Sequence, residues 1–301
     1  MNLETQAKQT IEKYNLIERK EKVVVALSGG KDSTTVLYIL HKLGYNVSGL
    51  MIDLHLGEWS RKNKENVEKF CLQLGVGLTV VDLKKELGQG ICFIKEILKK
   101  QRGLTGCSVC GVIKKWILNK YAKKLGADKI ATGHNLDDEC QTILMNFLKG
   151  NIKLGINSSP ATGIELNGNK STCFSSDGEL INNKDYLISE STKSPKLAGF
   201  AQRIKPLFFI PEDEIKKYSK KMNFPVLYER CPCAIGTYRV ETRNWMNGIS
   251  NKEKLKIVEN WLKIIPKLRK NEKIEIRECK KCGEPCKNDI CQFCKITDGF
   301  R

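Results

Sequence analysis

The sequence predicts an α/β protein built on a doubly wound parallel sheet, with a small C-terminal zinc-ribbon module. Between residues 20 and 150, apolar runs of strand length alternate with amphipathic segments of helical length, and the connections between them are short. This alternation is typical of parallel strands whose two faces are covered by helices. Near the C-terminus, two Cys-x-x-Cys pairs lie in a segment too short to bury a core of its own, which predicts that a metal ion holds it together.

The first half of the chain supplies the expected elements in alternation. Runs rich in valine, isoleucine and leucine predict the strands, and apolar positions three or four residues apart predict the helices. Several helices end at a glycine, a residue that commonly follows a helix C-terminus. The expected strands are residues 22–27, 47–53, 77–83 and 129–132, and the expected helices are residues 3–20, 33–43, 62–74, 91–100, 112–125 and 137–149.

The second half is less regular. Residues 156–200 are rich in Ser, Asn, Gly, Thr and Lys, and we interpret them as a flexible insertion with at most a short hairpin around Cys173 and Tyr186. Order returns at residues 203–207, Pro211 opens a helix over 212–222, and residues 237–265 are expected to be helical. The expected units are an N-terminal helix (1–20), a main domain that carries the insertion (21–270) and a C-terminal zinc-binding module (271–301).

The composition points to an anionic partner. The 301 residues include 52 Lys and Arg against 34 Asp and Glu, a net charge of +18. Nucleic acid is the leading candidate for so basic a chain, and a solvated basic surface is the alternative. No apolar run reaches the length of a membrane span and the N-terminal segment has no apolar signal core, so we expect a cytoplasmic protein without membrane association. In that compartment the 13 cysteines are expected to be thiols or metal ligands.

The most informative segment is the hexapeptide Ser28-Gly29-Gly30-Lys31-Asp32-Ser33. It follows an expected strand and precedes an expected helix, so free backbone N–H groups and the positive end of a helix dipole meet there. The glycines allow close approach of an anion, Lys31 adds positive charge, and the spacing differs from that of the Walker A loop. The hexapeptide predicts a phosphate site at the carboxyl end of a strand, where Asp53 and Gly133 are also expected. A glycine turn without a ligand is the alternative.

Four cysteines of the C-terminal segment form two knuckles separated by eight residues, a spacing that suits one tetrahedral Zn²⁺. Free thiols in a disordered segment are the alternative. We interpret Cys286, which lies between the knuckles, as a bystander. The four expected ligands are Cys279, Cys282, Cys291 and Cys294.

The main domain carries a second set of cysteines. Cys107 and Cys110 form a pair that cannot complete a four-ligand site, and Cys231 offers a third thiolate from far along the chain. Small buried hydrophobic side chains are the alternative interpretation of these three residues. The remaining single cysteines are expected to be packing residues; they are Cys71, Cys92, Cys140 and Cys173.

Three further segments complete the pattern: Thr132-Gly133-His134-Asn135-Leu136-Asp137-Asp138-Glu139, Gln141-Thr142-Ile143-Leu144-Met145-Asn146, and Cys231-Pro232 followed by Ala234. With the hexapeptide, Cys107-x-x-Cys110 and the C-terminal knuckles, the chain resembles the tRNA 2-thiouridine synthetases, a branch of the PP-loop ATP pyrophosphatases. This branch includes the archaeal and thermophile T-loop uridine thiolases and their wobble-uridine relatives. The resemblance covers about residues 20–155 and 203–296 and implies a PP-loop, Rossmann-like fold.

The resemblance implies roles for individual residues. Cys107, Cys110 and Cys231 correspond to three ligands of a [4Fe-4S] cluster, whose fourth iron is left open to hydrosulfide. Lys114 corresponds to the catalytic lysine, and Asp138 to the catalytic aspartate, which is expected to hold Mg²⁺ with the ATP phosphates. An exposed lysine of a basic helix, and a helix cap with first-turn charge, are the alternative interpretations. The implied ATP-binding residues are Ala26, Ser28, Gly29, Gly30, Lys31, Asp32, Ser33, Asp53, Gly133 and Asp137.

The implied reaction has two steps: ATP adenylates the C2 oxygen of a tRNA uridine, and sulfur then displaces AMP. The implied partners are tRNA, sulfide or a small thiocarboxylated sulfur-carrier protein, and a second copy of the chain in a homodimer. Residues 95–124 contain nine Lys or Arg and one Glu, a face expected to contact tRNA phosphates, as is the C-terminal module. Trp116 and Tyr121 of this segment either stack on a base or pack in the core.

The chain departs from the family in three places. Cys233 stands where similar proteins usually have another residue, and it is an alternative ligand, a sulfur carrier or without a role. No cysteine precedes Cys71, where related enzymes carry a second zinc module, and the insertion 156–200 is unusual. Four other functions are alternatives: a tRNA 2-thiocytidine synthetase, a PP-loop ligase that uses nitrogen, an RNA-binding or cluster-sensing protein without catalysis, and a desulfidase. The C-terminal knuckles argue against the first, the three cysteines against the second, and the intact ATP loop against the last two.

Overall fold

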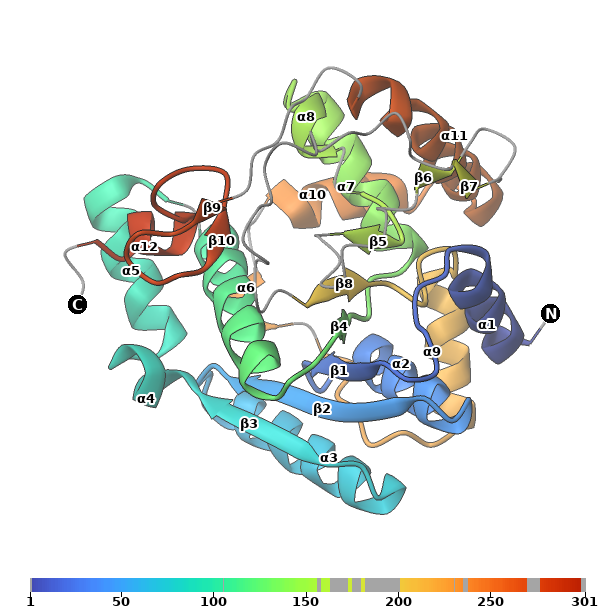
Figure 1. The fold of residues 1–301 in the computed structure, drawn as a ribbon, viewed down its shortest axis with the longest axis horizontal. Helices are drawn as coiled ribbons and strands as arrows, with labels where there is room; N and C mark the ends of the chain where they lie inside the picture. Colours follow the sequence, from blue (N-terminus) through green and yellow to red (C-terminus); the bar gives the residue numbers. More distant parts are fainter. Residues whose placement is uncertain are drawn as a thin grey trace.

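The computed structural model describes residues 2–104, 106–155, 158–162, 173–174, 180–181, 201–229, 231–234, 238–269 and 277–298. They form a six-stranded sheet with helices on both faces and a small C-terminal module (Figure 1). The module comprises β9 (Arg277–Glu278), β10 (Pro285–Cys286) and α12 (Gln292–Ile296). The predicted α/β fold class is confirmed. Within the described residues, no helix is both long enough and apolar enough to cross a membrane.

The strand order of the sheet is β3-β2-β1-β4-β8-β5. The chain leaves β1 toward β2 on one side and returns to β4 on the other side, so β1 and β4 flank the point at which the strand order reverses. Ligands of such sheets bind at this point, outside the carboxyl ends of the strands. The strands β1 (Lys22–Leu27), β2 (Asn46–Asp53), β3 (Leu78–Asp82), β4 (Lys129–Ala131) and β8 (Gln202–Ile204) are parallel, and β5 (Ala161–Thr162) is antiparallel to β8.

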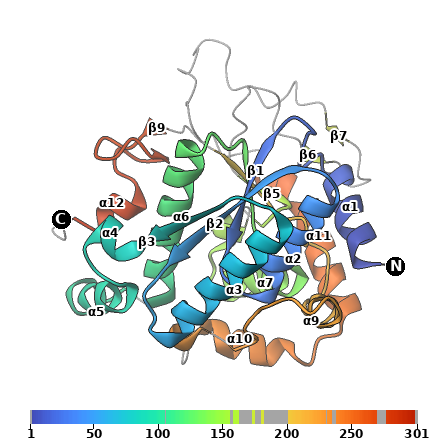
Figure 2. The ribbon, with the colours of Figure 1, turned by 90° about the horizontal axis from the view of Figure 1, so that it is seen from below.

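One face of the sheet is covered by helices that lie early in the chain and by α9. Val23, Val25 and Leu27 of β1 point to this face, because successive side chains of a strand point to opposite sides. Leu37 and Leu40 of α2 pack on them and are completely buried. Figure 2 shows these helices across the strands. They are α1 (Leu3–Lys13), α2 (Lys31–Lys42), α3 (Glu58–Leu74) and α9 (Glu212–Lys221).

The opposite face packs on α5 (Ile91–Arg102) and α6 (Gly106–Lys124), which follow the short α4 (Leu83–Leu87). Val24 and Ile130 of the sheet meet Ile113 and Ile117 of α6 in this core. The C-terminal module extends the same layer, and Figures 1 and 2 show it beside α5 and α6, far from α1. Its Phe293 stacks on Trp116, with ring centroids 3.9 Å apart and planes at 7°. Trp116 therefore packs in the core, as one of the two alternatives predicted.

A third layer contains α7 (Leu136–Leu148), α10 (Tyr238–Met246) and α11 (Asn251–Arg269) around the buried Phe208. The sequence predicts helix throughout 237–265, but the structure has two helices. Ser250 separates them through a capping box: its hydroxyl accepts the N–H of Glu253 at 3.3 Å, and the Glu253 carboxylate accepts the N–H of Ser250 at 2.8 Å. The Ser-x-x-Glu pattern in the sequence indicates the start of a second helix at this point.

Two other predicted helix boundaries are wrong. The first helix ends at Lys13 rather than residue 20, because the chain turns at Asn15, whose φ is +44°. The helix predicted from residue 112 begins at Gly106, so Cys107 and Cys110 lie in its first turn rather than before it. The sequence did not predict this helix start, because glycine has a low helix propensity and α6 contains Gly106 and Gly111 near its beginning.

The predicted insertion is described only in part. β6 (Cys173–Phe174) and β7 (Leu180–Ile181) form an antiparallel pair, in agreement with a hairpin at Cys173, whereas Tyr186 lies outside the described residues. The start of the predicted insertion is not an excursion from the domain. After α8 (Ile152–Gly155), β5 joins the main sheet and Ser158 is buried. Because the segment is polar, the sequence did not predict that β5 forms an edge strand of the sheet.

Candidate functional site

The hexapeptide forms a tight turn between β1 and α2. The backbone N–H of Ser28 donates to Oγ of Ser33 at 3.2 Å, and Oγ of Ser33 donates to the carbonyl of Gly30 at 3.1 Å. Gly29 has φ +79°, and a Cβ there would lie 2.2 Å from Oδ1 of Asn63. Only glycine fits at this position. Gly30 is the N-cap of α2 and gives it no side-chain cap, so the first N–H groups of the helix face outward for an anion.

The segment after β4 packs directly on this turn. A Cβ on Gly133 would lie 2.6 Å from the backbone nitrogen of Ser33, so the two segments touch through a glycine. Asn135 joins them by a second contact, since its Nδ2 donates to Oδ1 of Asp32 at 3.1 Å. Its Oδ1 accepts the N–H of Asp138 at 3.1 Å and caps α7. The two predicted motifs therefore meet at the switch point of the sheet.

The aspartate pair divides into two environments. Asp137 accepts the backbone N–H of Glu212 at 2.8 Å and the ammonium of Lys254 at 2.7 Å, one with each carboxylate oxygen. It thereby fixes the start of α9 and anchors α11. Asp138 turns to the phosphate loop and faces Arg239 at 3.3 Å and Arg243 at 3.6 Å. Asp137 therefore holds α9 and α11 in place, whereas Asp138 faces the two arginines of α10.

The side chains around the loop form a compact charge network. Lys31 contacts Oδ2 of Asp32 at 2.9 Å and Oε1 of Glu212 at 2.7 Å. Oε2 of Glu212 in turn accepts Arg243 at 2.7 Å. Burial by itself would lower the pKa of Lys31, but the carboxylates of Asp32 and Glu212 outweigh it and raise that pKa. Lys31 is therefore protonated at neutral pH. A phosphate could replace the Glu212 carboxylate as the partner of its ammonium.

The carboxylates of Asp32 and Asp138 have opposite pKa shifts. Burial raises the pKa of Asp32, and the charge of Lys31 offsets only part of this effect. Burial would also raise the pKa of Asp138, but the neighbouring His134 and the cations Arg239, Arg243 and Lys31 outweigh it and lower that pKa. Asp138 is thus an anion at any pH near neutrality.

Several of these residues were not singled out from the sequence. Glu212, Arg239 and Arg243 come from the second half of the chain, and Asn135 lay inside a recognised motif without an assigned role. The spacing of the two arginines by four residues on α10 was a readable signal of one helix face. Gln141 sets this helix beside α7, because its side-chain amide donates to the carbonyl of Arg239.

Asp53 and Ala26 lie at the same edge of the sheet. Ala26 is the penultimate residue of β1, and Asp53 ends the neighbouring β2. The Asp53 carboxylate accepts the backbone N–H of His55 at 3.0 Å, and that histidine contacts Asp82 at 2.8 Å. Asp53 thus ends the strand next to β1, and Asp82 ends β3, one strand further from the phosphate loop. A nucleotide-binding role for Ala26 and Asp53 stays a prediction.

Cys107, Cys110 and Cys231 converge on the N-terminus of α6. Cys107 and Cys110 are three residues apart in its first turn and lie on neighbouring positions of one helix face. Cys231 precedes the 3₁₀ turn η1 (Pro232–Ala234), which packs on α6. Burial raises the pKa of Cys110, while Lys114 and Lys95 lower it and Cys231 raises it further, so these groups are close neighbours. Cys107 is exposed, and the other two thiols are half-buried.

Three thiols near one helix terminus are a donor set that a [4Fe-4S] cluster can use. A tetrahedral ion such as Zn²⁺ binds thiolates at about 2.3 Å and therefore needs sulfurs within about 4 Å of one another. Among the residues that the structure describes, these three cysteines do not form a group with all sulfurs within 4.8 Å. A [4Fe-4S] cluster holds each thiolate on a different iron and so spaces them more widely. Lys114 lies one turn beyond Cys110 on the same helix.

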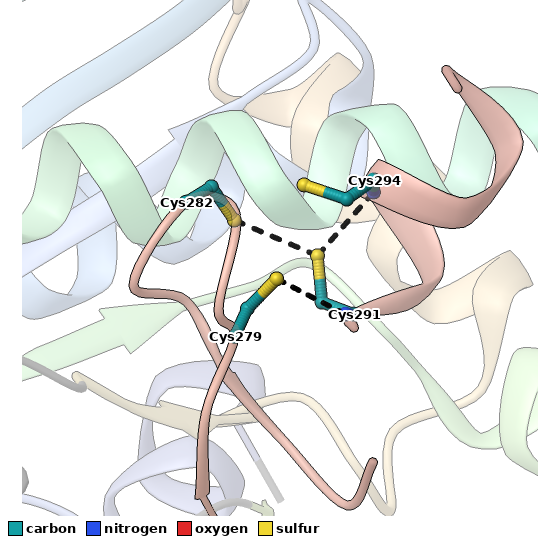
Figure 3. A group of neighbouring side chains, drawn as sticks. All are labelled: Cys279, Cys282, Cys291 and Cys294. Atoms are coloured by element: carbon teal, nitrogen blue, oxygen red, sulfur yellow. Dashed lines mark hydrogen bonds between the residues drawn. The ribbon is translucent and has the colours of Figure 1, made fainter. Parts of the chain in front are cut away.

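The C-terminal knuckles form a closed site. The sulfurs of Cys279, Cys282, Cys291 and Cys294 all lie within 4.8 Å of one another and point to a common centre (Figure 3). The N–H of Cys291 donates to Sγ of Cys279 at 3.2 Å, and the N–H of Cys294 donates to Sγ of Cys291 at 3.4 Å. Burial opposes the charged thiolate of Cys279, but the backbone N–H groups of Cys291, Lys281 and Cys282 lower its pKa to about 6. The predicted grouping is confirmed, and it fits a tetrahedral thiolate-binding ion.

Known proteins resemble the chain over nearly its full length. The family model of the PP-loop domain matches residues 1–225. The tRNA-5-methyluridine(54) 2-sulfurtransferase of Pyrococcus horikoshii is 33% identical over 300 residues, which cover 97% of this chain and 84% of that protein. The protein of the same name from Thermus thermophilus is 31% identical over 298 residues, covering 97% and 81%.

A solved structure shares the fold. The U34-tRNA thiolase NcsA from Methanococcus maripaludis, described with its [4Fe-4S] cluster, superposes with a TM-score of 0.72. The match covers 99% of this chain and 87% of that one, at 24% sequence identity. At this level of identity the superposition establishes the common architecture of the sheet and its helices.

Proposed function

Because this chain belongs to the PP-loop family of tRNA 2-thiolation sulfurtransferases, we propose that it is an ATP-dependent tRNA uridine 2-sulfurtransferase. The observation that carries the proposal is the contact of the phosphate loop with the segment that holds Asp138, at the switch point of the sheet. The thiols of Cys107, Cys110 and Cys231 gather on α6, which packs on β2 and β4 of the same sheet. One enzyme thus carries the parts for activation and for sulfur transfer.

The first step is adenylation. We propose that the free N–H groups at the start of α2, together with Lys31, bind the phosphates of ATP. Asp32 and Asp138 are the candidate Mg²⁺ ligands, since Mg²⁺ in nucleotide sites uses one or two carboxylates plus phosphate oxygens. The C2 oxygen of the uridine attacks the α-phosphate, pyrophosphate leaves, and Arg239 and Arg243 neutralise its charge. The carboxylate of Glu212 must release Lys31 and Arg243 when the phosphates enter.

The second step replaces oxygen by sulfur. Sulfur attacks C2 of the activated uridine and AMP departs with the former carbonyl oxygen. The residues that would hold a [4Fe-4S] cluster are Cys107, Cys110 and Cys231, and a cluster on three thiolates leaves one iron for hydrosulfide. Lys114, on the same helix, is positioned to stabilise negative charge that develops in this step.

The target nucleotide is proposed from the relatives. Of three relatives with more than 30% identity, those from Pyrococcus horikoshii and Thermus thermophilus are named for position 54, a 5-methyluridine, and the third is named a probable sulfurtransferase. We therefore propose the T-loop uridine as target, with the wobble uridine named for the NcsA structure as the alternative. The sulfur donor, sulfide or a thiocarboxylated carrier protein, and the homodimer stay predictions, as does the cytoplasmic location that reduced thiolate ligands require.

The tRNA surface is proposed on α5, α6 and the C-terminal module. The exposed basic residues of the two helices include Lys99, Lys100, Lys115, Lys123 and Lys124. In the module, Lys280 and Lys281 pair with Asp289 and Asp298, whereas Lys287 is exposed. Arg102 ties the two parts together by donating to the carbonyls of Lys295 and Asp298. We propose that Zn²⁺ on the four thiolates holds this surface in shape and takes no part in the chemistry.

Nucleoside mass spectrometry tests the function. Unmodified and 5-methylated tRNA is incubated anaerobically with cluster-reconstituted protein, MgATP and sulfide. We expect a 2-thio derivative of uridine or 5-methyluridine that appears only with ATP, and mapping of the tRNA fragment gives its position. New 2-thiocytidine would move the protein to the cytidine enzymes. Absence of any thionucleoside, with pyrophosphate release also absent, would favour a non-catalytic RNA-binding or sensing role.

A further inference from the structure

Two cysteines outside both predicted ligand sets lie against each other. Sγ of Cys92, on the first turn of α5, is 3.3 Å from Sγ of Cys233, in η1. The two residues are 141 positions apart in the sequence, so only the tertiary fold brings them together. Cys92 is exposed and Cys233 is half-buried. From the sequence, Cys233 is an alternative ligand, a sulfur carrier or without a role, and Cys92 is a packing residue, whereas the structure leaves Cys92 exposed beside Cys233.

The pair borders the proposed cluster site. Cys233 is two residues from Cys231, and η1 packs on α6 beside Cys110. Lys95, one turn after Cys92 on α5, reaches the start of α6, where a Cβ on Gly106 would lie 2.4 Å from its Cε. The Lys95 ammonium is thus between the pair and the first turn of α6, and it adds positive charge near both sets of thiols. An anionic sulfur species released by the pair would be retained there.

We propose that Cys92 and Cys233 form a dithiol that accepts sulfane sulfur from a hydropersulfide donor and releases it as hydrosulfide next to Cys231. This inference rests on the proposed function and names the chemical class of its sulfur source. It differs from metal binding, because two thiols do not complete a metal site and sulfurs 3.3 Å apart are closer than thiolates that a cluster holds on different irons. The proposal also gives a chemical role to Cys233, which stands where similar proteins usually have another residue.

The reaction has two balanced exchanges. The Cys92 thiolate attacks the outer sulfur of a donor R–S–SH, the S–S bond of the donor breaks, and R–SH leaves, so that Cys92 carries a persulfide. The Cys233 thiolate then attacks Sγ of Cys92, the outer S–S bond breaks, and HS⁻ leaves as the Cys92–Cys233 disulfide forms. The sum is R–SSH plus two thiols giving R–SH, H₂S and one disulfide. The two thiols supply the two electrons that reduce the sulfane sulfur, and a thiol reductant later reopens the disulfide.

Exposure assigns the order of the two thiols. A donor in solution reaches Cys92 on the outer face of α5, whereas Cys233 is partly covered and meets Cys92 from inside. Closing the disulfide requires the two sulfurs to approach by about 1.3 Å, since an S–S bond is about 2.0 Å long. Cys233 lies on a single 3₁₀ turn rather than in a long helix, so a shift of this size disturbs few hydrogen bonds.

The first test reads the pair itself. Full-length, cluster-reconstituted protein is treated anaerobically with glutathione persulfide, hydrosulfide is measured, and the protein is alkylated and digested for peptide mass spectrometry. We expect hydrosulfide release above the rate without protein and a peptide cross-linked through Cys92 and Cys233. Cys92→Ser and Cys233→Ser should lose both signals, whereas Cys286→Ser, a half-buried thiol elsewhere, should keep both. Separate alkylation of Cys92 and Cys233 with unchanged hydrosulfide release in the serine variants would overturn the proposal.

The second test separates this inference from the proposed function. Thiolation of tRNA is measured with glutathione persulfide and with inorganic sulfide, and the two rates are compared as a ratio. The relay predicts that the persulfide-driven rate divided by the sulfide-driven rate falls in Cys92→Ser and stays at the wild-type value in Cys286→Ser. A wild-type value of this ratio in both variants contradicts the relay. If the wild-type protein thiolates with neither donor, the proposed function fails, while the cross-linked peptide still decides whether the dithiol accepts sulfane sulfur.

Discussion

The two cysteine sites of this protein differ in how the chain assembles them. The C-terminal quartet comes from one short segment, and its four sulfurs lie within 4.8 Å of one another, three of them buried. The set of Cys107, Cys110 and Cys231 is more open, more exposed and drawn from two distant segments. A closed site suits a structural metal, whereas an open site has room for a reactant. We therefore propose that cysteine serves stability in the C-terminal module and chemistry at the N-terminal end of α6.

The largest expected effect is on the closed site. Cys279→Ser should remove the bound zinc and release the module from α6, because structural zinc contributes about 10–16 kcal/mol of apparent folding free energy in small zinc modules. Zinc content by mass spectrometry and hydrogen exchange of α6 around Trp116 measure this change. Cys286→Ser is the matched control and should retain both zinc and protection. A protein that keeps zinc after Cys279→Ser would remove the contrast between the two sites.

Cys231→Ala tests the open site. We expect iron content to fall and thiolation to drop at least about a thousandfold, which corresponds to about 4 kcal/mol of transition-state stabilisation. The free energy of unfolding should fall by less than in Cys279→Ser, because Cys231 is half-buried and belongs to none of the hydrophobic clusters of the described residues. Iron analysis, nucleoside mass spectrometry and chemical denaturation are measured on the same preparation. Full iron content together with full activity would show that the three-ligand assignment is wrong.

Lys31→Ala tests whether the adenylation step and the cysteine site depend on different residues. Loss of this cation from the phosphate loop should lower ATP-dependent pyrophosphate release by about 10²–10³-fold. Iron content should stay at the wild-type level, because Lys31 lies outside the cysteine site. Lys42→Ala, at the other end of the same helix, is the control and should release pyrophosphate normally. Pyrophosphate release at the normal rate in Lys31→Ala would take the loop out of the mechanism.

The smallest expected effect concerns the contact between the two motifs of the ATP site. Gly133→Ala places a Cβ 2.6 Å from the nitrogen of Ser33 and should cost about 1–3 kcal/mol of stability, as other overpacked sites do. It should also raise the KM for ATP, because the loop must shift to make room. Gly77→Ala, where a Cβ meets nothing within 4 Å, is the control. Equal denaturation midpoints for the two variants would contradict the close contact.

The ATP site was predictable in outline and incomplete in detail. The hexapeptide and Asp138 were recognisable because candidate residues for binding phosphate and Mg²⁺ follow a strand in a fixed local order. Glu212, Arg239 and Arg243 were not assigned, because long-range packing of α9 and α10 sets their distance from the loop. Asp137 was predicted beside Asp138 in the site, yet both of its oxygens accept hydrogen bonds or a charge within the protein.

The sequence by itself determined what depends on neighbours in the chain. Alternating strands and helices specified the α/β sheet, a glycine turn before a helix specified the phosphate loop, and the spacing of two knuckles specified the closed thiolate site. Only the tertiary structure decided which distant groups meet. It placed Gly133 on Ser33, closed the charge network of Lys31 with Glu212, and set Cys92 against Cys233. Local order is set by backbone geometry and hydrogen bonding over a few residues, whereas contacts between distant residues follow from how the helices pack on the sheet.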